Sequence, residues 1–435
     1  MPSKHDLLAA IHADRNGLVH FLQSLISAPS PNPPGDTTAV AQVIVEFLSQ
    51  YGVHTDVITA SDNMPNVVSV LNEPAPGPCL VMNPHIDVFP VSDDGEWKHG
   101  PWSGDIENGR IYGRGVVDMK AGTAAQVAAF AHLRRLLGSD LLNKICNRKC
   151  ALVAVSDEET GGRWGSRYLL DHDARKDIWR GDVVLNAEPT GLQSIRFAEK
   201  GTLRLTFTVR TKSAHGAYVH LSEGAIRIAT RLITRLLALE SFTGFDLDPD
   251  LRAHLADEDV HHGTRRCGNM LRPTVNIGTI RGGDKVNTIP GLCVFETDIR
   301  LPIGLTADIA LAQIHKILDD FPGAGVKVQE AASNPPNFCS PEHEIVRAVQ
   351  RNAEAVLGGK EKKGRTPLAI PSMGATDCKF WRYRGVPAYS YGLSPDGMAG
   401  RDESVNVEDY IKLVKIQAGT VWDWLTEQEG NEEES

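Results

Sequence analysis

The 435-residue sequence has little of several features that would place a protein in a special class. Residues 1–14 are charged and polar throughout and contain no apolar core of the roughly 7 to 15 residues that a secretory signal needs. No segment reaches the roughly 18 consecutive apolar residues of a membrane-spanning helix. Positive charge is in deficit, because 45 Lys and Arg face 55 Asp and Glu. Nucleic acid and anionic lipid, which both need a basic patch, are therefore not favoured as partners.

Cysteine is sparse and scattered, with seven residues along the chain: Cys79, Cys146, Cys150, Cys267, Cys293, Cys339 and Cys378. A single Cys-x3-Cys, at 146 and 150, is a weak zinc signal without a second pair. We expect buried or free thiols in a reducing, cytoplasmic environment. A chain of this length with 41% hydrophobic residues buries enough surface to be stable without disulfides or metals. Any metal site must therefore serve another purpose than stability.

The first part of the chain alternates between helix and strand patterns. Residues 36–52 and 121–137 have apolar side chains at helical spacing, and short apolar runs at 66–71, 79–82 and 151–156 are typical of buried strands. This alternation predicts an α/β domain with a mostly parallel sheet covered by helices.

The pattern changes near residue 197, and residues 202–211 alternate with period two, which predicts a half-exposed antiparallel strand. Further helix and strand patterns predict a smaller α+β domain over residues 198–332. Helix patterns return at 343–357 and 407–425, so the first domain is predicted to comprise 1–197 and 333–435. The acidic tail, 427–435, is expected to be disordered and solvated.

Candidate metal ligands follow the predicted strands. His85 and Asp87 come directly after the run 79–82, at the edge where open α/β sheets carry their sites. A neutral imidazole binds zinc well, and a carboxylate two residues on can hold its ring. Taken alone, this pair could equally include a surface histidine.

Carboxylates follow the next strand-like segments. Asp118 lies in a glycine-rich stretch before a helix, Glu158 and Glu159 end the run 151–156, and Glu188 follows the run 183–185. Singly, these residues could be a helix cap or a solvated acidic loop. Together with His85 they predict a metal site, and this mixture of ligands favours zinc, with cobalt or manganese as alternatives, over calcium.

These motifs resemble the zinc metallopeptidase and amidohydrolase family of acetylornithine deacetylase, succinyl-diaminopimelate desuccinylase, aminoacylase-1 and glutamate carboxypeptidase. The resemblance runs from about residue 15 to 425 and is carried by these motifs: His85-x-Asp87, the stretch 97–102, Gly113-Arg-Gly115, Asp118-Met-Lys120, Glu158-Glu159, Glu188-Pro-Thr190, His215, Asn287 and Asp298-Ile-Arg300. It implies a catalytic α/β domain interrupted by a lid and dimerisation domain, and a homodimer through that lid.

The resemblance also implies a set of metal ligands. Asp118 would bridge two zinc ions, His85 and Glu188 would complete the first, and Glu159 would serve the second.

Catalytic and substrate-binding roles follow in the same way. Glu158 would be the general base, Asp87 would support the His85 ring, and His215 would reach across the dimer to the substrate carbonyl. From its own surroundings, His215 could equally lie in a surface loop. The residues expected to bind substrate are Asn287, Lys379 and Arg300, and Arg300 could equally form a structural ion pair.

One family ligand is missing. The family's last zinc ligand is a histidine four residues before a glutamate, and Glu403 aligns that position with Ala399. Asp396 and Asp402 are the acidic side chains that could replace it. We therefore expect one firm zinc site and an altered second site.

The predicted function is a metal-dependent amidohydrolase that cleaves the amide bond of an N-acyl amino acid or a small peptide-like substrate. Two alternatives stay open. A metal beside a glutamate base could serve condensation, elimination or isomerisation at a carbonyl, and the scaffold could be an inactive binding protein. The acyl group and the amine are not determined by the sequence.

Overall fold

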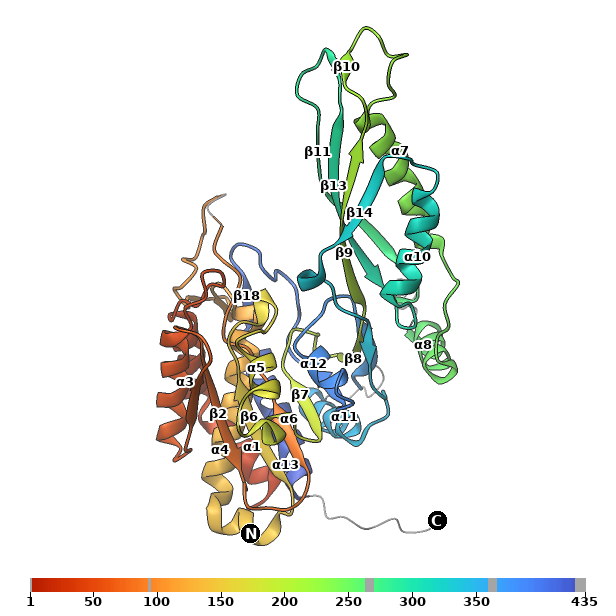
Figure 1. Ribbon diagram of the computed structural model, residues 1–435. Helices are drawn as coiled ribbons and strands as arrows, with labels where there is room; N and C mark the ends of the chain where they lie inside the picture. Colours follow the sequence, from red (N-terminus) through yellow and green to blue (C-terminus); the bar gives the residue numbers. More distant parts are fainter. Residues whose placement is uncertain (1, 93–94, 263–269, 359–365, 427–435) are drawn as a thin grey trace. The chain divides into compact units, whose positions relative to one another are not determined.

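The computed structural model describes residues 2–92, 95–262, 270–358 and 366–426 (Figure 1). Cys267 and the tail 427–435 therefore lie outside the described residues. The chain divides into two compact units. The larger unit consists of Met1–Phe197, Cys339–Ala369 and Thr376–Ser435, and the smaller unit consists of Ala198–Phe338 and Ile370–Ala375.

The main sheet has nine strands in the order β1-β2-β6-β3-β7-β17-β8-β15, and β16 also pairs with β8. Their bounds are β1 Asp56–Thr59, β2 Pro65–Leu71, β3 Cys79–Met82, β6 Lys149–Ala154, β7 Val183–Asn186, β8 Ser194–Glu199, β15 Asn337–Phe338, β16 Leu368–Ser372 and β17 Ala388–Ser390. The central strands β6, β3, β7 and β17 run parallel, whereas β1, β2, β8 and β15 pair antiparallel. The predicted α/β class is confirmed, and the sheet is mixed, with its parallel part at the centre.

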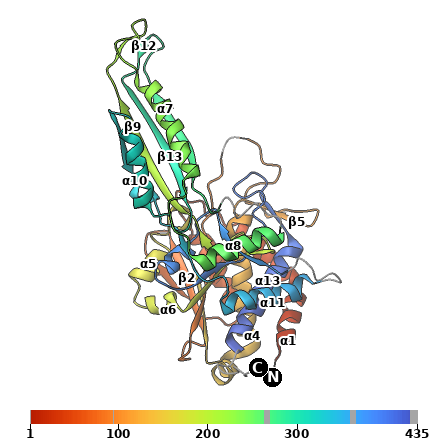
Figure 2. The same ribbon diagram turned by 90° about the vertical axis from the view of Figure 1, so that its right-hand side faces the viewer.

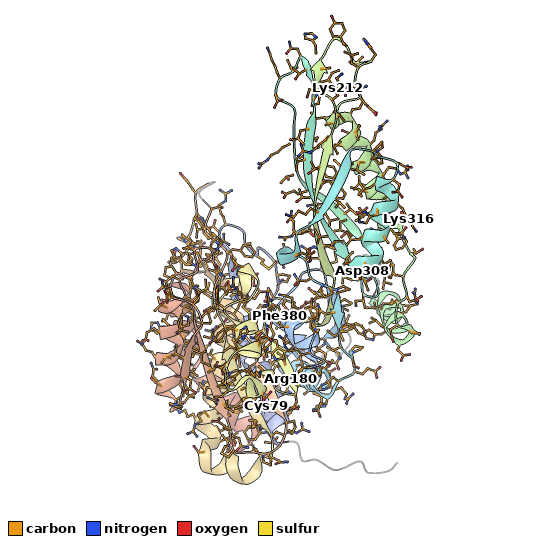
Figure 3. All side chains as sticks on the ribbon, viewed as in Figure 1. Cys79, Arg180, Lys212, Asp308, Lys316 and Phe380 are labelled. Carbon is orange, nitrogen blue, oxygen red and sulfur yellow. The ribbon has the colours of Figure 1, made fainter. Side chains whose placement is uncertain are left out.

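Helices cover both faces of this sheet (Figure 1). On one face, α5 (Ser166–Asp171), α6 (Lys176–Arg180) and α12 (Cys378–Arg382) share a core with alternate residues of β3 and β6. Figure 3 labels Cys79 of β3 and Phe380 of α12, which both belong to this core. The intervening strand residues, such as Leu80 and Leu152, are also fully buried. Their burial explains why these strands read as continuous apolar runs.

The remaining helices of the larger unit pack on one another and on β2 and β6. They are α1 (Lys4–Ala13), α2 (Arg15–Ile26), α3 (Thr38–Gln50), α4 (Ala121–Ile145), α11 (Glu344–Leu357) and α13 (Val407–Thr426). Three short strands, β4 (Ile106–Glu107), β5 (Arg110–Tyr112) and β18 (Ser404–Asn406), form a separate small sheet. No helix in the described ranges is both long enough and apolar enough to cross a membrane.

The smaller unit is built on a four-stranded antiparallel sheet in the order β11-β13-β9-β14. The strands are β9 (Gly201–Arg210), β11 (Thr274–Gly282), β13 (Leu292–Leu301) and β14 (Ala324–Val328), and the helices are α7 (Ala225–Leu237), α8 (Pro249–His262) and α10 (Ala307–Leu318). Side chains of β9 alternate between buried and more exposed positions, as the period-two pattern predicted. Helices α7 and α10 cover the buried face (Figure 2).

The smaller unit begins at Ala198 and ends later in the chain than the sequence indicated. Strand β15 pairs with β8 through Asn337 and Glu199, and through Phe338 and Ala198. This pairing carries the smaller unit to Phe338, beyond the expected end at residue 332. A two-residue strand is too short to produce a readable pattern.

The six cysteines in the described ranges are all free, and five of them are buried. This agrees with the expectation of buried or free thiols.

Candidate metal centre

Three side chains converge at the carboxyl end of the parallel strands. His85 Nε2 lies 3.2 Å from Asp118 Oδ1 and 3.5 Å from Glu188 Oε1. One ligand atom from each side chain lies within 4.8 Å of the others, and in the part of the chain that the structure describes this is the only such cluster of three. All three side chains are almost completely shielded from solvent.

The strand order explains why these residues meet. His85 extends β3 by a parallel bridge to Val155, just beyond β6, and Glu188 follows β7 on the other side of β3. Asp118 lies in the turn before α4, which begins at Ala121. Because the carboxyl ends of parallel strands share one edge, residues distant in sequence come together there.

Asp87 contacts both His85 and the loop that contains Glu158 and Glu159. It is completely buried and accepts hydrogen bonds from the backbone N–H groups of Glu158 (3.2 Å) and Glu159 (3.1 Å). The Nδ1 atom of His85 lies 2.9 Å from the Asp87 carbonyl oxygen and 3.6 Å from the Asp87 carboxylate. An Nδ1–H that donates to this carbonyl leaves Nε2 free to bind a metal.

Asn32 also contacts Asp87, and no motif in the sequence marks it as a site residue. Its Nδ2 donates to Asp87 Oδ2 (2.8 Å) and lies 3.3 Å from Asp157 Oδ1. The available signal was the run Pro31-Asn-Pro-Pro34, which marks a stiff turn but says nothing about its distant contacts.

Glu158 and Lys379 lie side by side. Lys379 Nζ is 4.0 Å from Glu158 Oε1 and 4.0 Å from Asp377 Oδ1, and it donates to the Thr376 carbonyl oxygen at 3.0 Å. Burial raises the pKa of Glu158 to about 8, while the Lys379 ammonium acts in the opposite direction. The structure therefore places Lys379 against the expected base, and its expected contact with substrate stays a prediction.

The electrostatics of this cluster suit a bound cation. Burial, followed by the Asp118 carboxylate, raises the pKa of Glu188 well above its usual value and that of Glu159 to about 10. Burial alone would lower the pKa of His85, but the Glu188, Asp118 and Asp87 carboxylates raise it well above its usual value. Several buried acids around one imidazole hold protons when no cation balances them. A divalent ion would replace those protons, and nitrogen with carboxylate oxygen is a donor set that suits zinc.

The residues expected around a second ion have the following surroundings. Glu159 Oε1 is buried and has no hydrogen-bond partner among the described residues. Ala399 is exposed in a left-handed turn with φ 59°. Asp396 accepts from Ser394 Oγ (2.7 Å), and Asp402 accepts from the His99 N–H (2.9 Å). Neither aspartate joins the three-ligand cluster found in the described residues.

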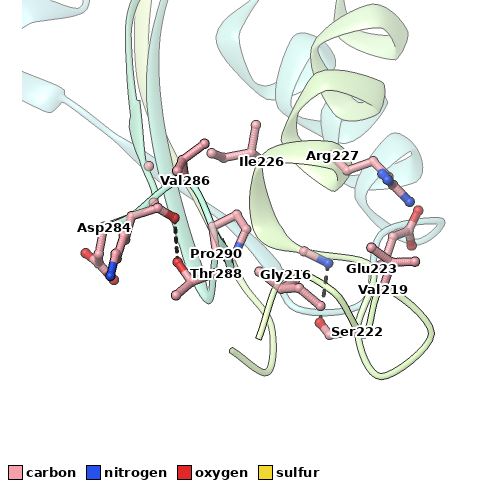
Figure 4. A pocket seen from close by; sticks show the side chains of 15 residues that line it. Gly216, Val219, Ser222, Glu223, Ile226, Arg227, Asp284, Val286, Thr288 and Pro290 are labelled. Carbon is pink, nitrogen blue, oxygen red and sulfur yellow. Dashed lines mark hydrogen bonds between the residues drawn. The ribbon is translucent and has the colours of Figure 1, made fainter. Parts of the chain in front are cut away.

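The smaller unit brings together two of its three predicted site residues. Strand β10 (Ala214–His215) pairs with β12 (Thr288–Ile289), and the Gly216 N–H donates to the Asn287 carbonyl oxygen at 2.7 Å. His215 and Asn287 are both exposed beside a pocket of about 620 Å³ (Figure 4), whose lining includes Gly216, Val219, Ile226, Arg227, Val286 and Thr288.

Arg300 lies apart from His215 and Asn287, near the carboxyl end of β13. Its guanidinium forms an ion pair with Asp298 through Nε (2.9 Å) and Nη2 (3.0 Å), and Nη1 donates to Thr202 Oγ1 (3.2 Å). This geometry is that of the structural ion pair considered as the alternative for Arg300.

A buried cluster of imidazole and carboxylates, with a further glutamate beside it at the end of a parallel sheet, defines a metallohydrolase centre. The chain belongs to peptidase family M20/M25/M40, whose family model matches residues 81–423. It is therefore a metal-dependent hydrolase that acts on amide bonds, as the motif resemblance predicted.

Known relatives and solved structures match nearly the whole chain. A succinyl-diaminopimelate desuccinylase of Methylorubrum extorquens is 30% identical over an alignment of 404 residues that covers 91% of this chain and 95% of the relative. The M20-family metallo-carboxypeptidase Sso-CP2 of Sulfolobus solfataricus has a TM-score of 0.71 at 21% identity and covers 93% of this chain and 98% of its own. The YXEP protein of Bacillus subtilis, a dinuclear metal-binding M20 peptidase, has a TM-score of 0.61 at 12% identity, with 95% and 99% covered.

Proposed function

We propose that this chain is a zinc-dependent amidohydrolase that cleaves the amide bond of an N-acyl amino acid or a small peptide-like substrate. The observation that carries the proposal is the cluster of His85, Asp118 and Glu188, with Glu158 beside it. The desuccinylase relative supports N-succinyl amino acids as the first substrates to test.

Each residue of the larger unit has a chemical task in this proposal. A divalent cation held by His85, Asp118 and Glu188 would polarise the scissile carbonyl and lower the pKa of a water molecule. Glu158 accepts the proton of the attacking water at its carboxylate and passes it to the leaving amine. Lys379, 4.0 Å away, favours the ionised form of Glu158 that can accept this proton.

We further propose that the second metal position is altered. Asp118 and Glu159 can contribute two carboxylates there, but Ala399 offers no ligand where the resembling family has histidine. Structural and catalytic zinc sites normally use three or four protein ligands. Zinc at this position is therefore expected to be weak or absent.

The smaller unit is proposed to form a homodimer in which His215 serves the partner's site. Support comes from exposed apolar side chains around the pocket of Figure 4, among which Val219 is 58% exposed and Val286 is fully exposed. Exposed apolar patches of this kind mark interfaces. His215 would donate a hydrogen bond to the developing oxyanion, and Asn287 would bind the substrate. The free cysteines support the proposed cytoplasmic location.

The test combines metal content with turnover. Zinc per chain is measured after dialysis against modest zinc, and the same sample is offered N-succinyl amino acids, N-acetyl amino acids and dipeptides. About one zinc per chain with hydrolysis supports the proposal. Bound zinc without hydrolysis of any substrate would favour another reaction at a carbonyl, and a protein that binds no zinc would overturn the assignment.

A further inference from the structure

The buried carboxylate of Glu403 accepts hydrogen bonds from the turn that contains Asp118. Glu403 is 1% exposed, and four donors surround its two oxygens. Oε1 accepts from the N–H groups of Val117 (2.7 Å) and Asp118 (3.3 Å). Oε2 accepts from the Gly115 N–H (3.2 Å) and from Arg114 Nη1 (2.8 Å). Three of the four donors are thus backbone groups of one turn, and one of them belongs to a metal ligand.

Within the turn, the N–H groups of Val116 and Lys120 donate to the carbonyl oxygens of Gly113 (3.2 Å) and Gly115 (2.7 Å), which leaves the N–H groups of Gly115, Val117 and Asp118 to other acceptors. Gly115 adopts a left-handed conformation (φ 76°), and a Cβ there would lie 2.1 Å from Val88 Cγ1. Asp118 has φ −121° and ψ 97°, which is not helical, and it precedes α4, so its N–H has no carbonyl partner within that helix. Buried backbone N–H groups need acceptors, and Glu403 supplies them for Gly115, Val117 and Asp118.

Arg114 connects the Glu403 carboxylate to Gly400, three residues earlier in the chain. Its side chain is 2% exposed, Nη1 also donates to the Gly400 carbonyl oxygen (3.1 Å), and its guanidinium lies 5.2 Å from the centre of the Trp97 ring. A buried ion pair contributes little net stability once desolvation is counted. Its effect here is to hold the Glu403 carboxylate near the Gly400 carbonyl oxygen.

We infer that Glu403 is a positioning residue of the metal centre, which acts through the backbone of Gly115–Asp118 to aim the Asp118 carboxylate at His85. The inference rests on the proposed metal site. In it, Glu403 acts without touching the metal or the substrate itself. Glu403 touches the ligand turn at three backbone groups, so a small shift of its oxygens moves Asp118 directly.

Glu403→Gln is the informative variant. In either orientation of the glutamine amide, its NH₂ group faces two of the four donors and cannot accept their hydrogen bonds. Loss of a group that orients a ligand typically weakens metal binding by about 10-fold to 100-fold, and we expect that range here.

The matched control is Asp14→Asn, the same chemical change in the larger unit. Asp14 Oδ2 accepts from Tyr51 Oη (2.6 Å) and lies 3.1 Å from His132 Nε2, so it serves a different hydrogen-bond network. Arg114→Lys provides a second comparison, because it keeps a positive charge beside Glu403 and leaves the three backbone bonds in place.

Zinc affinity is measured by competition with a chromogenic chelator, and the visible spectrum of the cobalt(II) protein reports ligand geometry. Weakening of about 10-fold or more in Glu403→Gln, with Asp14→Asn and Arg114→Lys within about 3-fold of the parent, supports the inference. Parent-like affinity and an unchanged cobalt spectrum in Glu403→Gln would overturn it while leaving the proposed function intact. A parent that binds no zinc would overturn both.

If Glu403→Gln does not fold, Glu403→Asp decides the question. This variant keeps the charge but withdraws both oxygens by one carbon. Weakened zinc binding in the folded variant supports the positioning role, and parent-like binding contradicts it.

Discussion

Glu158 and Glu159 are neighbours in sequence with different surroundings. Both backbone N–H groups donate to Asp87, but the Glu158 carboxylate lies beside Lys379 whereas Glu159 Oε1 has no hydrogen-bond partner among the described residues. Environments that separate two adjacent carboxylates assign them different tasks. The Lys379 ammonium beside Glu158 is consistent with a proton acceptor. The oxygen of Glu159 without a partner is consistent with a metal ligand.

We expect Glu158→Gln to retain the metal and lose most turnover, because the amide keeps the side chain's shape but cannot accept a proton. Loss of a general base costs about 100-fold to 10,000-fold in rate. The measurement is kcat together with zinc per chain. Glu159→Gln is the matched control, since it alters the adjacent carboxylate and should leave the cluster of His85, Asp118 and Glu188 loaded. Activity of Glu158→Gln within a few-fold of the parent would remove Glu158 from the mechanism.

A second prediction concerns Ala399. Histidine tolerates the left-handed backbone found there better than most residues, so Ala399→His should fold and restore the missing ligand. Bound zinc is expected to rise from about one toward about two per chain. Ala399→Gln, of similar size but a poor zinc ligand, should stay near the parent value. Equal zinc content in the two variants would show that residue 399 does not face the second position.

At the scale of elements, α4 contains a buried histidine outside the metal centre. His132 is 3% exposed, and its Nε2 shares Asp14 Oδ2 with the Tyr51 hydroxyl. Burial lowers the pKa of His132, against the opposing effect of Asp14. The folded chain therefore holds this imidazole neutral at a pH where the unfolded chain binds a proton.

The sign of the pH effect follows from that difference. The stability linked to His132 is fully present above pH 6.5, the usual pKa of histidine, and is lost as the pH falls toward the lowered pKa of the folded state. Thermal unfolding of the parent and of His132→Gln is compared between pH 7 and about 5. The midpoint of the parent should fall more steeply on acidification than that of the variant. Parallel curves would contradict the prediction.

The sequence predicted elements best where pattern and burial agree. The run 79–82 corresponds to β3 residue for residue, because all four side chains are buried. Helix α4 extends to Ile145 as two helical segments, because Gly138 (φ 60°) is not helical and interrupts the helix directly after the predicted end at 137. Helix α1 was not predicted in the polar start, since only Leu7 and Ile11 are buried on it.

The convergence of His85, Asp118 and Glu188 was predictable from the sequence, whereas the residues that support this cluster were not. Residues at successive strand ends carry a readable signal, because strand order brings them to one edge. Asn32 and Glu403 act on Asp87 and on the Asp118 turn from loops 55 and 285 residues away in sequence. No local pattern reports such contacts. The antiparallel flanks of the sheet were missed for a similar reason, because strand direction depends on how the chain crosses over.

At the scale of the whole molecule, the predicted catalytic groups fall on both units. The metal cluster belongs to the larger unit, whereas His215 and Asn287 belong to the smaller one. If His215 serves a partner, a working site needs two chains, and each chain contributes to two sites.

Mixing two weak variants tests this arrangement. His215→Ala should lower the chemical step by about 100-fold to 1,000-fold, as expected for one lost oxyanion donor, without loss of metal. Mixed dimers with Glu158→Gln contain one site with both residues intact. Random exchange puts half of the dimers in this class, so about one quarter of the parent activity should return. No recovery, with subunit exchange confirmed by mass, would place His215 outside its partner's site.

The distribution of the larger unit along the chain has a consequence for biosynthesis. Its core joins α1 to α13, where Lys4 Nζ lies 2.6 Å from Asp423, whereas the smaller unit occupies an almost continuous segment in between. On the ribosome, the smaller unit is nearly complete when α13 has not yet been translated. Strand β6, which α13 contacts in the folded chain, therefore lacks this helix during more than 250 residues of synthesis. Apolar surface of the larger unit thus stays exposed on the nascent chain longer than that of the smaller unit, and such surface is prone to aggregation.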